Sequence, residues 1–508
     1  MREYGLFIDG KFVGSSSGET VDSIDPSTGE IVARVPKASK RDARKAIDAA
    51  RRAFDDGEWS ERSPESRRDA LLALCDRLWD RQAEIADLES RDSGMTIRNA
   101  TVMVAAGIQQ ARDLIRIAAE IPLTEALPYN EFPLPAQHVL VREPYGVVSA
   151  IVPFNAPFVL AAWKIFPAMA TGNTVVLKPS PHTPCSAMET AVAVSESDIP
   201  PGVFNVLPGS GVDVGEELVS NALIDRVAFT GSTEAGRRIG QLAAPTVKRV
   251  TLELGGKSAN ILLDDADLEV AIPGALWAIY LNQGQTCQAG SRLIVPAERH
   301  DEIVDRIVSA ATQLRVGPSA SWDSDLGPLI SKQQLDRVER YVRLGRDDGA
   351  QLACGGHRLT DEGLLDGYFF APTVFANVRN DMRIAQEEIF GPVLSVIPYK
   401  TVDEAVKLAN ASIYGLAGAV WSTDVPRALS VARRIKAGTV WVNDYHVLVP
   451  SGPYGGYRQS GLGKELGVAG CLEFVQSKQV WIDQGRTLKS HIWAPVLGLD
   501  RIFGITYE

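Results

Sequence analysis

The chain has 508 residues, of which 45% are hydrophobic and 23% charged, with 52 Lys and Arg against 63 Asp and Glu. The net charge of −11 at pH 7 argues against nucleic acid or an anionic membrane as the main partner. The composition is that of a globular protein rather than a disordered one, and the length favours roughly three domains.

The cysteine and histidine content limits the chemistry further. Five scattered cysteines do not make a disulfide framework and favour a reducing compartment, so we expect a cytoplasmic protein. The six His show no metal-ligand spacing, and no metal site is expected. The N-terminus lacks the apolar core of a signal peptide. The most apolar region, 147–170, contains Asn155, Lys164 and three prolines, which predicts a buried strand, loop and helix rather than a membrane span.

The predicted elements begin with helices and continue as an alternating pattern. Residues 37–120 are predicted to be helical, with Ser39 and Asp42 as a first-turn signal. From residue 146, short apolar runs alternate with helical windows. The predicted strands are 147–151, 174–177, 203–207, 226–229 and 250–252, and the helices between them are 183–195, 212–220 and 234–242. This alternation predicts a parallel, doubly wound sheet with ligands at the carboxyl ends of its strands.

A second α/β block follows. Its predicted strands are 259–263, 293–295, 393–396 and 439–442, and its predicted helices are 267–282, 300–314 and 402–409. Two strand-like pieces, 132–145 and 477–484, lie outside both blocks. They could pair with each other or with another subunit.

Three residues could carry catalysis. Cys287 follows a predicted helix in a turn rich in Gly and Gln, where an accessible thiolate would be a strong nucleophile. The alternative is a small buried hydrophobe, the interpretation we keep for the other four cysteines. Glu253 stands between two leucines before a glycine pair, and it could be a general base whose pKa is raised by burial or a locally paired carboxylate. Asn155 lies between two prolines, and it could donate to an oxyanion or simply form a turn.

Glycine turns offer a phosphate site. Residues 229–236, Phe-Thr-Gly-Ser-Thr-Glu-Ala-Gly, predict a strand, a tight turn and a helix start, where backbone N–H groups favour phosphate. Neither this segment nor Gly209-Ser210-Gly211 is a G-x-G-x-x-G fingerprint. Lys178, at the end of a predicted strand, could bind a ribose or phosphate or be a solvated surface lysine.

The joint order of these motifs is more specific than any one of them. Pro-Phe-Asn155, Lys178-Pro-Ser, the 229–236 segment, Glu253-Leu-Gly-Gly, Gly-Gln-Thr-Cys287 and Glu387-Glu388-Ile-Phe390-Gly-Pro together resemble the aldehyde dehydrogenase superfamily. The resemblance runs from about residue 5 to 484 and includes Pro-Tyr-Gly-Gly-Tyr-Arg-Gln-Ser-Gly at 453–461. It implies an α/β fold with a Rossmann-type parallel-sheet cofactor domain, a second α/β catalytic domain and a small β oligomerisation element.

The same resemblance implies domain boundaries. Residues 1–121 and 145–255 would form the NAD(P)-binding domain and 256–459 the catalytic domain, with oligomerisation strands in 122–144 and 475–486. A homo-oligomer, dimer or tetramer, is expected. The remaining residues, 487–508, are an apolar C-terminal extension that we expect to pack on its own body or on a neighbouring subunit.

By resemblance, the enzyme is a hydrolytic, non-acylating, NAD(P)-dependent aldehyde dehydrogenase. Cys287 would attack the aldehyde to give a thiohemiacetal, Asn155 and the Cys287 N–H would form the oxyanion hole, and Glu253 would activate the water that hydrolyses the thioester. Lys164 and Glu465 match the positions of a proton relay, although structural pairing explains them as well.

The cofactor residues implied by the resemblance follow the strand ends. They are Ile151, Pro153, Phe154, Lys178, Ser180, Pro181, Gly211, Phe229, Gly231, Ser232, Gly236, Leu254, Gly255, Glu388 and Phe390. Many NAD-preferring members carry a Glu three residues after the lysine, whereas this chain has Pro181 followed by His182. NADP is therefore not excluded, but NAD is favoured because no Arg is nearby in the sequence to hold a 2′-phosphate.

The substrate tunnel can also be located by alignment to the motifs. Its lining positions are Ala156, Val159, Leu160, Trp163, Leu281, Thr286, Gln288, His446, Leu448 and Tyr454. Most are apolar or aromatic, which favours uncharged aliphatic or aromatic aldehydes as the small-molecule partner. A distal carboxylate would need a cationic anchor, and only Lys164 is nearby. Trp163 and Tyr454 could form part of an aromatic box, which leaves a betaine-aldehyde-type enzyme open.

Two other functions are less favoured. Dehydrogenases that pass the thioester to coenzyme A resemble this chain but generally lack a base at the position of Glu253. A non-catalytic binding protein with this fold would normally have lost Cys287, Asn155 or Glu253, and all three are present.

Overall fold

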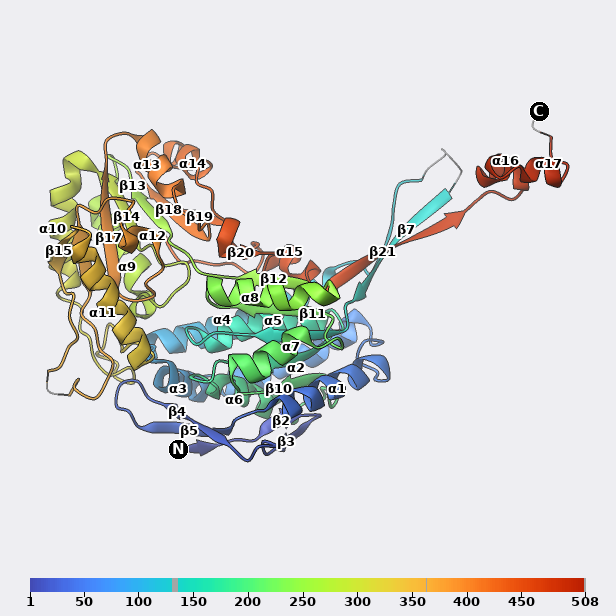
Figure 1. The fold of residues 1–508 in the computed structure, drawn as a ribbon, viewed down its shortest axis with the longest axis horizontal. Coiled ribbons are helices and arrows are strands. Elements are labelled where there is room, and N and C mark those ends of the chain that lie inside the picture. The colour runs from blue at the N-terminus through green and yellow to red at the C-terminus, as the bar shows by residue number, and fades with distance from the viewer. Residues whose placement is uncertain (130–135, 362, 507–508) are drawn as a thin grey trace.

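The computed structural model describes residues 1–129, 136–361 and 363–506. Figure 1 shows two lobes side by side and an arm that leaves the body and carries the C-terminal helices. Each lobe is built on one large sheet covered by helices. The predicted α/β class is confirmed.

The first lobe contains an eight-stranded sheet. Its strands, in spatial order, are β20 (Gly461–Leu462), β12 (Arg249–Glu253), β11 (Arg226–Thr230), β8 (Val147–Ile151), β9 (Thr174–Lys178), β10 (Phe204–Val206), β2 (Leu6–Ile8) and β3 (Lys11–Val13). The five strands from β12 to β10 are parallel, and the edge strands are antiparallel. The strand order reverses between β8 and β11, and such a switch point is where doubly wound sheets bind ligands.

Helices cover both faces of this sheet. They are α1 (Lys40–Asp55), α2 (Pro64–Asp80), α3 (Gln82–Ser93), α4 (Ile97–Glu120), α5 (Pro157–Ala170), α6 (Cys185–Ser195), α7 (Glu216–Ser220), α8 (Thr233–Ala243) and α15 (Gly467–Leu472). Ser39 and Asp42 form a reciprocal capping box at the start of α1, as the sequence predicts. Helix α5 is buried along its whole length because it lies between the sheet and α4.

The second lobe contains a seven-stranded sheet. Its strands, in spatial order, are β15 (Gln351–Cys354), β16 (Thr373–Ala376), β17 (Val393–Tyr399), β14 (Arg292–Pro296), β13 (Ala259–Leu262), β18 (Ala417–Trp421) and β19 (Thr439–Val442). All neighbours are parallel except β15 and β16. The helices are α9 (Leu268–Tyr280), α10 (His300–Ala311), α11 (Lys332–Asp347), α12 (Arg383–Gln386), α13 (Val402–Asn410) and α14 (Val425–Ala432).

The arm is an antiparallel pair. Strand β21 (Val475–Asp483) pairs with β7 (Ala136–Pro144) along its full length, and β6 (Thr124–Ala126) adds a third strand. The two strand-like pieces outside the blocks therefore pair with each other; residues 132–135 of the prediction lie outside the described residues. A further small sheet joins β1 (Arg2–Glu3), β5 (Ile31–Pro36) and β4 (Thr20–Ile24).

The predicted elements differ from the structure in specific places. All nine strands predicted in the two blocks are present, but six further strands of the two large sheets were not predicted: β2, β3, β15, β16, β18 and β20. Strand β18 contains Ala-Gly-Ala, a weak strand sequence, and it is fully buried between β13 and β19. The helix predicted over 267–282 ends at Tyr280 because Asn282 and Gln283 have left-handed φ values of 51° and 56°. The helix predicted over 212–220 is a π-helical turn, Gly211–Gly215, followed by α7.

The C-terminal extension does not pack on its own body. It forms α16 (Trp493–Val496) and α17 (Leu499–Ile502), which pack on each other beyond the arm. Six large apolar side chains remain exposed there: Ile492, Trp493, Val496, Leu497, Ile502 and Phe503. In the described part of the chain, no helix is both long enough and apolar enough to span a bilayer.

Candidate active site

A cavity of about 840 Å³ lies at the switch point, between the two lobes. The first lobe contributes Pro153, Phe154 and Asn155 after β8, and Gly231 and Ser232 after β11. The second lobe contributes the turn that carries Cys287, the loop that carries Glu388 and Phe390, and one face of α11. Nine of the predicted site residues thus line one cavity: Pro153, Phe154, Asn155, Gly231, Ser232, Gly255, Cys287, Glu388 and Phe390.

The turn before Cys287 is held in place by a side-chain hydrogen bond. The side-chain amide of Asn282 donates to the carbonyl of Asn155 at 2.7 Å, so the turn is tied to the opposite lobe. The Cys287 sulfur lies 3.6 Å from the hydroxyl of Tyr454. Burial raises the pKa of the Cys287 thiol to about 12, and therefore the resting thiol is protonated and needs a base to become a nucleophile.

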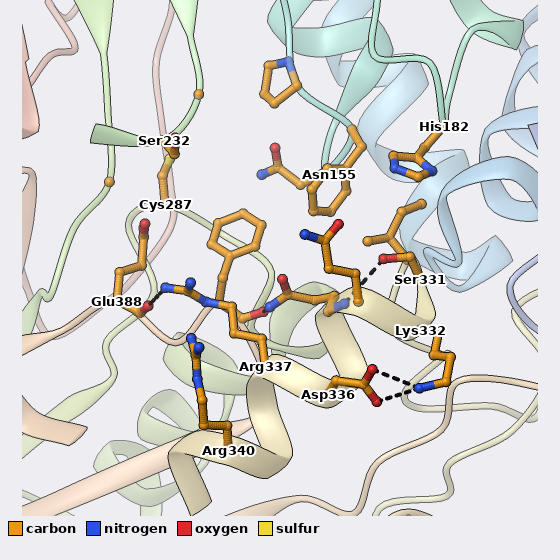
Figure 2. Close-up of a pocket in the computed structure, with 18 of the residues that line it drawn as sticks. Asn155, His182, Ser232, Cys287, Ser331, Lys332, Asp336, Arg337, Arg340 and Glu388 are labelled. Atoms are coloured by element: carbon orange, nitrogen blue, oxygen red, sulfur yellow. Dashed lines mark hydrogen bonds and ion pairs between the residues drawn. The ribbon is translucent and has the colours of Figure 1, made fainter. Parts of the chain in front are cut away.

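The Asn155 side chain faces the cavity that Cys287 also lines (Figure 2). It is only 7% exposed, and within the described residues its amide nitrogen donates to no protein atom. A buried donor without an internal partner suits an oxygen that arrives with the substrate. A role in forming the turn would not explain why the Asn155 amide faces the cavity without a protein partner.

Glu253 ends strand β12 and is 3% exposed. Neither carboxylate oxygen has a hydrogen-bond partner among the described residues, which favours the general-base interpretation over local pairing. Burial, and then the nearby charge of Glu465, raise the pKa of Glu253 well above its ordinary value. A Cβ at Gly455 would lie 2.6 Å from Glu253 Oε1, so this glycine leaves the space that the carboxylate occupies.

A buried ion pair lies beside Glu253. Lys164 pairs with Glu465, and its Nζ also donates to Thr230 Oγ1 at 2.7 Å. The backbones of Glu465 and Tyr454 exchange hydrogen bonds of 2.6 and 2.7 Å, which link this pair to the wall next to Cys287. The second oxygen of Glu465 has no partner in the described chain. This geometry permits a proton relay and also serves as structural pairing.

The β11–α8 connection has the features of a phosphate site. Ser232 caps α8, accepting from the Ala235 N–H at 3.2 Å. A Cβ at Gly236 would lie 2.4 Å from Leu254 Cδ2, so a larger residue there would displace the Leu254 side chain that packs under the helix. Gly231 and Ser232, just before the start of α8, line the cavity, and the first N–H groups of a helix favour an anion.

Glu388 faces this connection across the cavity. Its Oε1 accepts from the Gly256 N–H at 3.1 Å, and burial raises its pKa to about 7. A Cβ at Gly255 would lie 2.4 Å from Glu388 Oε2, so a larger residue at this position would displace the Glu388 carboxylate. Phe390 has a φ of +62°, a conformation that directs the loop back toward Phe154, whose ring centroid is 5.7 Å away.

Lys178 is not a solvated surface lysine. It is 4% exposed, its Nζ donates to the Pro179 carbonyl at 3.0 Å, and burial lowers its pKa to about 8. Several predicted cofactor residues lie outside the cavity lining: Ile151, Lys178, Ser180, Pro181, Gly211, Phe229, Gly236 and Leu254. Of these, Ile151, Phe229 and Leu254 pack in the core under α8, so their side chains support the site from behind.

Helix α11 was missed by sequence reasoning. It contributes Ser331 at its cap and seven residues from Lys332 to Arg343 to the cavity. Gln334 donates to the Phe390 carbonyl at 2.7 Å and Arg337 donates to the Ile389 carbonyl at 3.2 Å, so the helix holds the Glu388–Phe390 loop. The signal was the Ser331 cap followed by buried Leu335, Val338 and Val342 at helical spacing. His182, whose ring centroid is 6.5 Å from that of Phe154, also lines the cavity; the sequence analysis noted it only as the residue after Pro181.

The predicted substrate residues lie on the other side of Cys287. Trp163 and Tyr454 meet with ring centroids 5.6 Å apart, and Leu448 packs against the same cluster. Val159 is buried in that cluster, and Leu160 and Ala156 belong to it as well. Thr286 donates to the Leu281 carbonyl at 3.3 Å, within the turn itself. Gln288 and His446, the polar exceptions, are hydrogen-bonded to each other at 2.9 Å.

Among the described residues, no three His, Cys, Asp or Glu side chains gather in a way that could hold a metal ion.

Comparison with known proteins agrees with this geometry. The model of the "Aldehyde dehydrogenase family" matches residues 12–480. DhaS of Bacillus subtilis (strain 168), which is named for the same family, is 46% identical over 487 residues, covering 94% of this chain and 95% of its own length. The betaine aldehyde dehydrogenase of the same organism is 41% identical over 477 residues, covering 94% and 96%. The crystal structure of Staphylococcus aureus betaine aldehyde dehydrogenase with NAD+ has a TM-score of 0.93 and 38% identity, covering 95% of each chain.

Proposed function

This chain belongs to the aldehyde dehydrogenase family, and from that premise we propose that it oxidises uncharged aldehydes to carboxylic acids with NAD, through Cys287 as nucleophile. The observation that carries the proposal is the shared cavity of Cys287 and Asn155, with the unpartnered Glu253 carboxylate at the end of the neighbouring strand β12.

The residues at the switch point fit a nicotinamide dinucleotide. The capped start of α8 offers backbone N–H groups to a pyrophosphate, and Glu388 offers a carboxylate to a ribose hydroxyl. The rings of Phe154 and Phe390 offer an apolar wall to the nicotinamide. When bound, the nicotinamide supplies the hydride acceptor of the reaction.

Bond formation begins at Cys287. Its thiol loses a proton to a base, the sulfur attacks the aldehyde carbon, and the carbonyl oxygen becomes an oxyanion that the Asn155 amide and the Cys287 N–H stabilise. Loss of a hydride from that carbon leaves a thioester on Cys287. Glu253 then takes a proton from water, the hydroxide adds to the thioester, and the carbon–sulfur bond breaks to release the acid. Lys164 and Glu465 carry the proton away from Glu253 in this proposal.

The tunnel wall supports uncharged substrates. Val159, Leu160, Trp163 and Tyr454 are buried and pack together, and Lys164, on the same helix as Val159 and Trp163, is already paired with Glu465. A substrate with a distal carboxylate would find no free anchor in this wall. Higher kcat/KM for succinic semialdehyde than for hexanal and benzaldehyde would contradict this part of the proposal.

A betaine-aldehyde dehydrogenase is the second candidate. Two aromatic rings, those of Trp163 and Tyr454, meet at 5.6 Å and 60°, and such a pair could receive a quaternary ammonium group. Two relatives bear this name. A kcat/KM for betaine aldehyde above that for hexanal would favour the second candidate over the first.

The test is absorbance at 340 nm with purified protein, NAD or NADP, and the aldehyde panel, beside Cys287→Ala. We expect turnover with NAD that the substitution abolishes. A requirement for coenzyme A would indicate an acylating enzyme, and no turnover under any condition would indicate a binding protein. Turnover with NADP would show that Pro181 and His182 tolerate a 2′-phosphate.

For the assembly, we infer a homo-oligomer, a dimer or a tetramer, that uses the arm in 122–144 and 475–486. The supporting observation is that β21 is an edge strand with Val480, Trp481 and Ile482 exposed. We also propose that the boundary between the two domains lies between residues 255 and 256, because β12 and β13 belong to different sheets.

A cytoplasmic location stays a prediction.

A further inference from the structure

Two polar side chains interrupt the apolar wall beside the nucleophile. Gln288 follows Cys287 in the chain and is 6% exposed. Its amide nitrogen lies 2.9 Å from Nδ1 of His446. A buried amide and imidazole in an apolar tunnel carry a desolvation cost unless each of their polar atoms finds a partner. The hydrogen-bond partners of each polar atom of Gln288 and His446 therefore indicate which atom is left to bind a ligand.

The proton on His446 can be placed from its surroundings. Its Nε2 lies 3.1 Å from the Ala278 carbonyl, an oxygen that can only accept, so Nε2 carries the hydrogen. The ring is enclosed by the rings of Trp277, Trp441 and Tyr445, with centroids 5.7, 6.3 and 4.8 Å away. Burial lowers the pKa of His446 to about 4, so the imidazole is neutral at the pH of an assay and Nδ1 is an acceptor.

This tautomer fixes the Gln288 amide. Because His446 Nδ1 accepts, the NH₂ group of Gln288 must point toward it, and the carbonyl oxygen must point away. Within the described residues, that oxygen receives no hydrogen bond from the protein. His446 itself is held with a φ of +70°, so its position is imposed by the fold rather than by backbone preference. The result is a fixed acceptor next to Cys287 that has no donor.

The Gln288–His446 pair lies outside the cofactor cavity that Cys287 lines. Leu448 packs both against the cluster that contains Trp163 and Tyr454 and against the Trp441–Tyr445 cluster around His446. The pair therefore continues the wall along which an aldehyde would reach Cys287.

We propose that the Gln288 carbonyl, oriented by His446, selects aldehydes that carry a hydroxyl donor on C2 or C3 over their alkyl counterparts. The inference rests on the proposed function and names its substrate class. We assign the hydroxyl to C2 or C3 because Gln288 adjoins the nucleophile in the chain, so that its side chain is closer to the bound carbonyl than to the distal end of a substrate. A quaternary ammonium group has no hydrogen to donate and would leave the acceptor unpaired.

The test uses pairs of aldehydes in which a hydroxyl replaces a methyl group: 3-hydroxypropanal with butanal, and 2-hydroxypropanal with 2-methylpropanal. We expect the hydroxy compound to have the higher kcat/KM in the wild-type enzyme, and the ratio to fall about tenfold in Gln288→Met. In His446→Phe the ratio should fall similarly although Gln288 is intact, because the amide is then free to turn. His446→Asn, whose side-chain oxygen can accept in place of Nδ1, should restore part of the ratio.

The double variant separates orientation from mere packing. If His446 acts through Gln288, adding His446→Phe to Gln288→Met should not lower the ratio further. An unchanged ratio in Gln288→Met, or a wild-type ratio at or below one, would overturn the proposal. Absence of NADH formation with all four aldehydes would instead count against the proposed function, so the two failures are distinguishable. Thermal melting of each variant, followed by circular dichroism, checks that a lower ratio of kcat/KM values does not result from unfolding.

Discussion

At the scale of single residues, the two buried carboxylates of the site differ in what surrounds them. Glu388 accepts one backbone N–H, whereas Glu253 has no protein donor among the described residues. Burial without a donor raises the pKa of Glu253 and favours its protonated form, which suits a group that exchanges a proton with water. Glu253 is therefore the residue whose replacement should separate the two halves of the reaction.

Glu253→Gln should keep acylation and lose deacylation. We expect a burst of about one NADH per active site, followed by turnover roughly 10² to 10⁴ times slower than wild type, because the amide cannot take a proton from water. Stopped-flow absorbance gives the burst, and mass spectrometry should show the acyl group on Cys287. Asp336→Asn is the control, since this carboxylate lines the same cavity but is exposed and paired with Lys332. Steady-state turnover of Glu253→Gln within threefold of wild type would contradict the prediction.

Glu388 provides a prediction on pH. Burial raises its pKa from 4.5 to about 7 in the folded enzyme, so between these values the folded state binds more protons than the unfolded state. Stability linked to this group is present below pH 4.5 and declines as the pH rises toward 7. The full shift corresponds to about 3 kcal/mol.

The variant Glu388→Gln isolates the contribution of this carboxyl group to the pH dependence of stability. Glu388→Gln cannot ionise, so its melting temperature relative to wild type should increase between pH 5 and pH 7.5 in the absence of cofactor. Thermal melts at both pH values measure the difference, and Asp336→Asn again serves as an exposed control. A difference that is the same at both pH values would show that Glu388 titrates near its ordinary pKa.

At the scale of elements, α11 decides the shape of the cofactor side. Its side chains reach the carbonyls of the Glu388–Phe390 loop, which no short-range interaction would hold in place. The left-handed φ of Phe390 shows that the loop needs such support. The helix and the loop are more than 40 residues apart in the chain, so their contact is a product of the tertiary fold.

Arg337→Met should loosen this loop. We expect KM for NAD to rise about tenfold with a smaller change in kcat, because a hydrogen-bonded cation that positions Glu388 is lost while Cys287 and Glu253 are untouched. Steady-state kinetics with varied NAD measures this split. Arg346→Met, in the last turn of the same helix and outside the cavity, is the control. Equal effects of the two substitutions would show that the helix, not the contact, is responsible.

At the scale of the whole molecule, the arm and the extension expose apolar surface that the body does not cover. Val480 and Ile482 point to the same side of β21, being two residues apart in a strand, and they are 37% and 41% exposed. An edge strand with apolar side chains favours association with another chain. This is the basis of the proposed dimer or tetramer.

Val480→Lys with Ile482→Lys should reduce the assembly to smaller species. Light scattering coupled to size exclusion measures the mass directly, with 54.9 kDa expected for one chain. Lys478→Gln, on the same side of β21, is the control and should leave the mass unchanged. If the wild-type protein itself has the mass of one chain, the proposed dimer or tetramer is wrong.

Much of the fold was accessible from local sequence. The buried strands β8, β9 and β11 are short and mostly apolar on both faces, as is typical of strands covered on both sides. The glycine turn after β11 indicates the start of a helix. The capping box at Ser39 is also a local pattern. Strands β2 and β18 were missed because they are short or built of Ala and Gly, and their neighbours, not their sequences, make them strands.

The sequence by itself determined the order of strands and helices, the turns that need glycine and the residue types of the site, because these depend on interactions between near neighbours. Only the tertiary structure decided which of them meet. It buried Lys178 and left Glu253 without a partner, brought α11 to the Glu388 loop, and set Gln288 against His446, 158 residues away. The physical reason is that the burial of a side chain, its pKa and its hydrogen-bond partner depend on contacts between distant segments. A local sequence pattern does not predict those contacts.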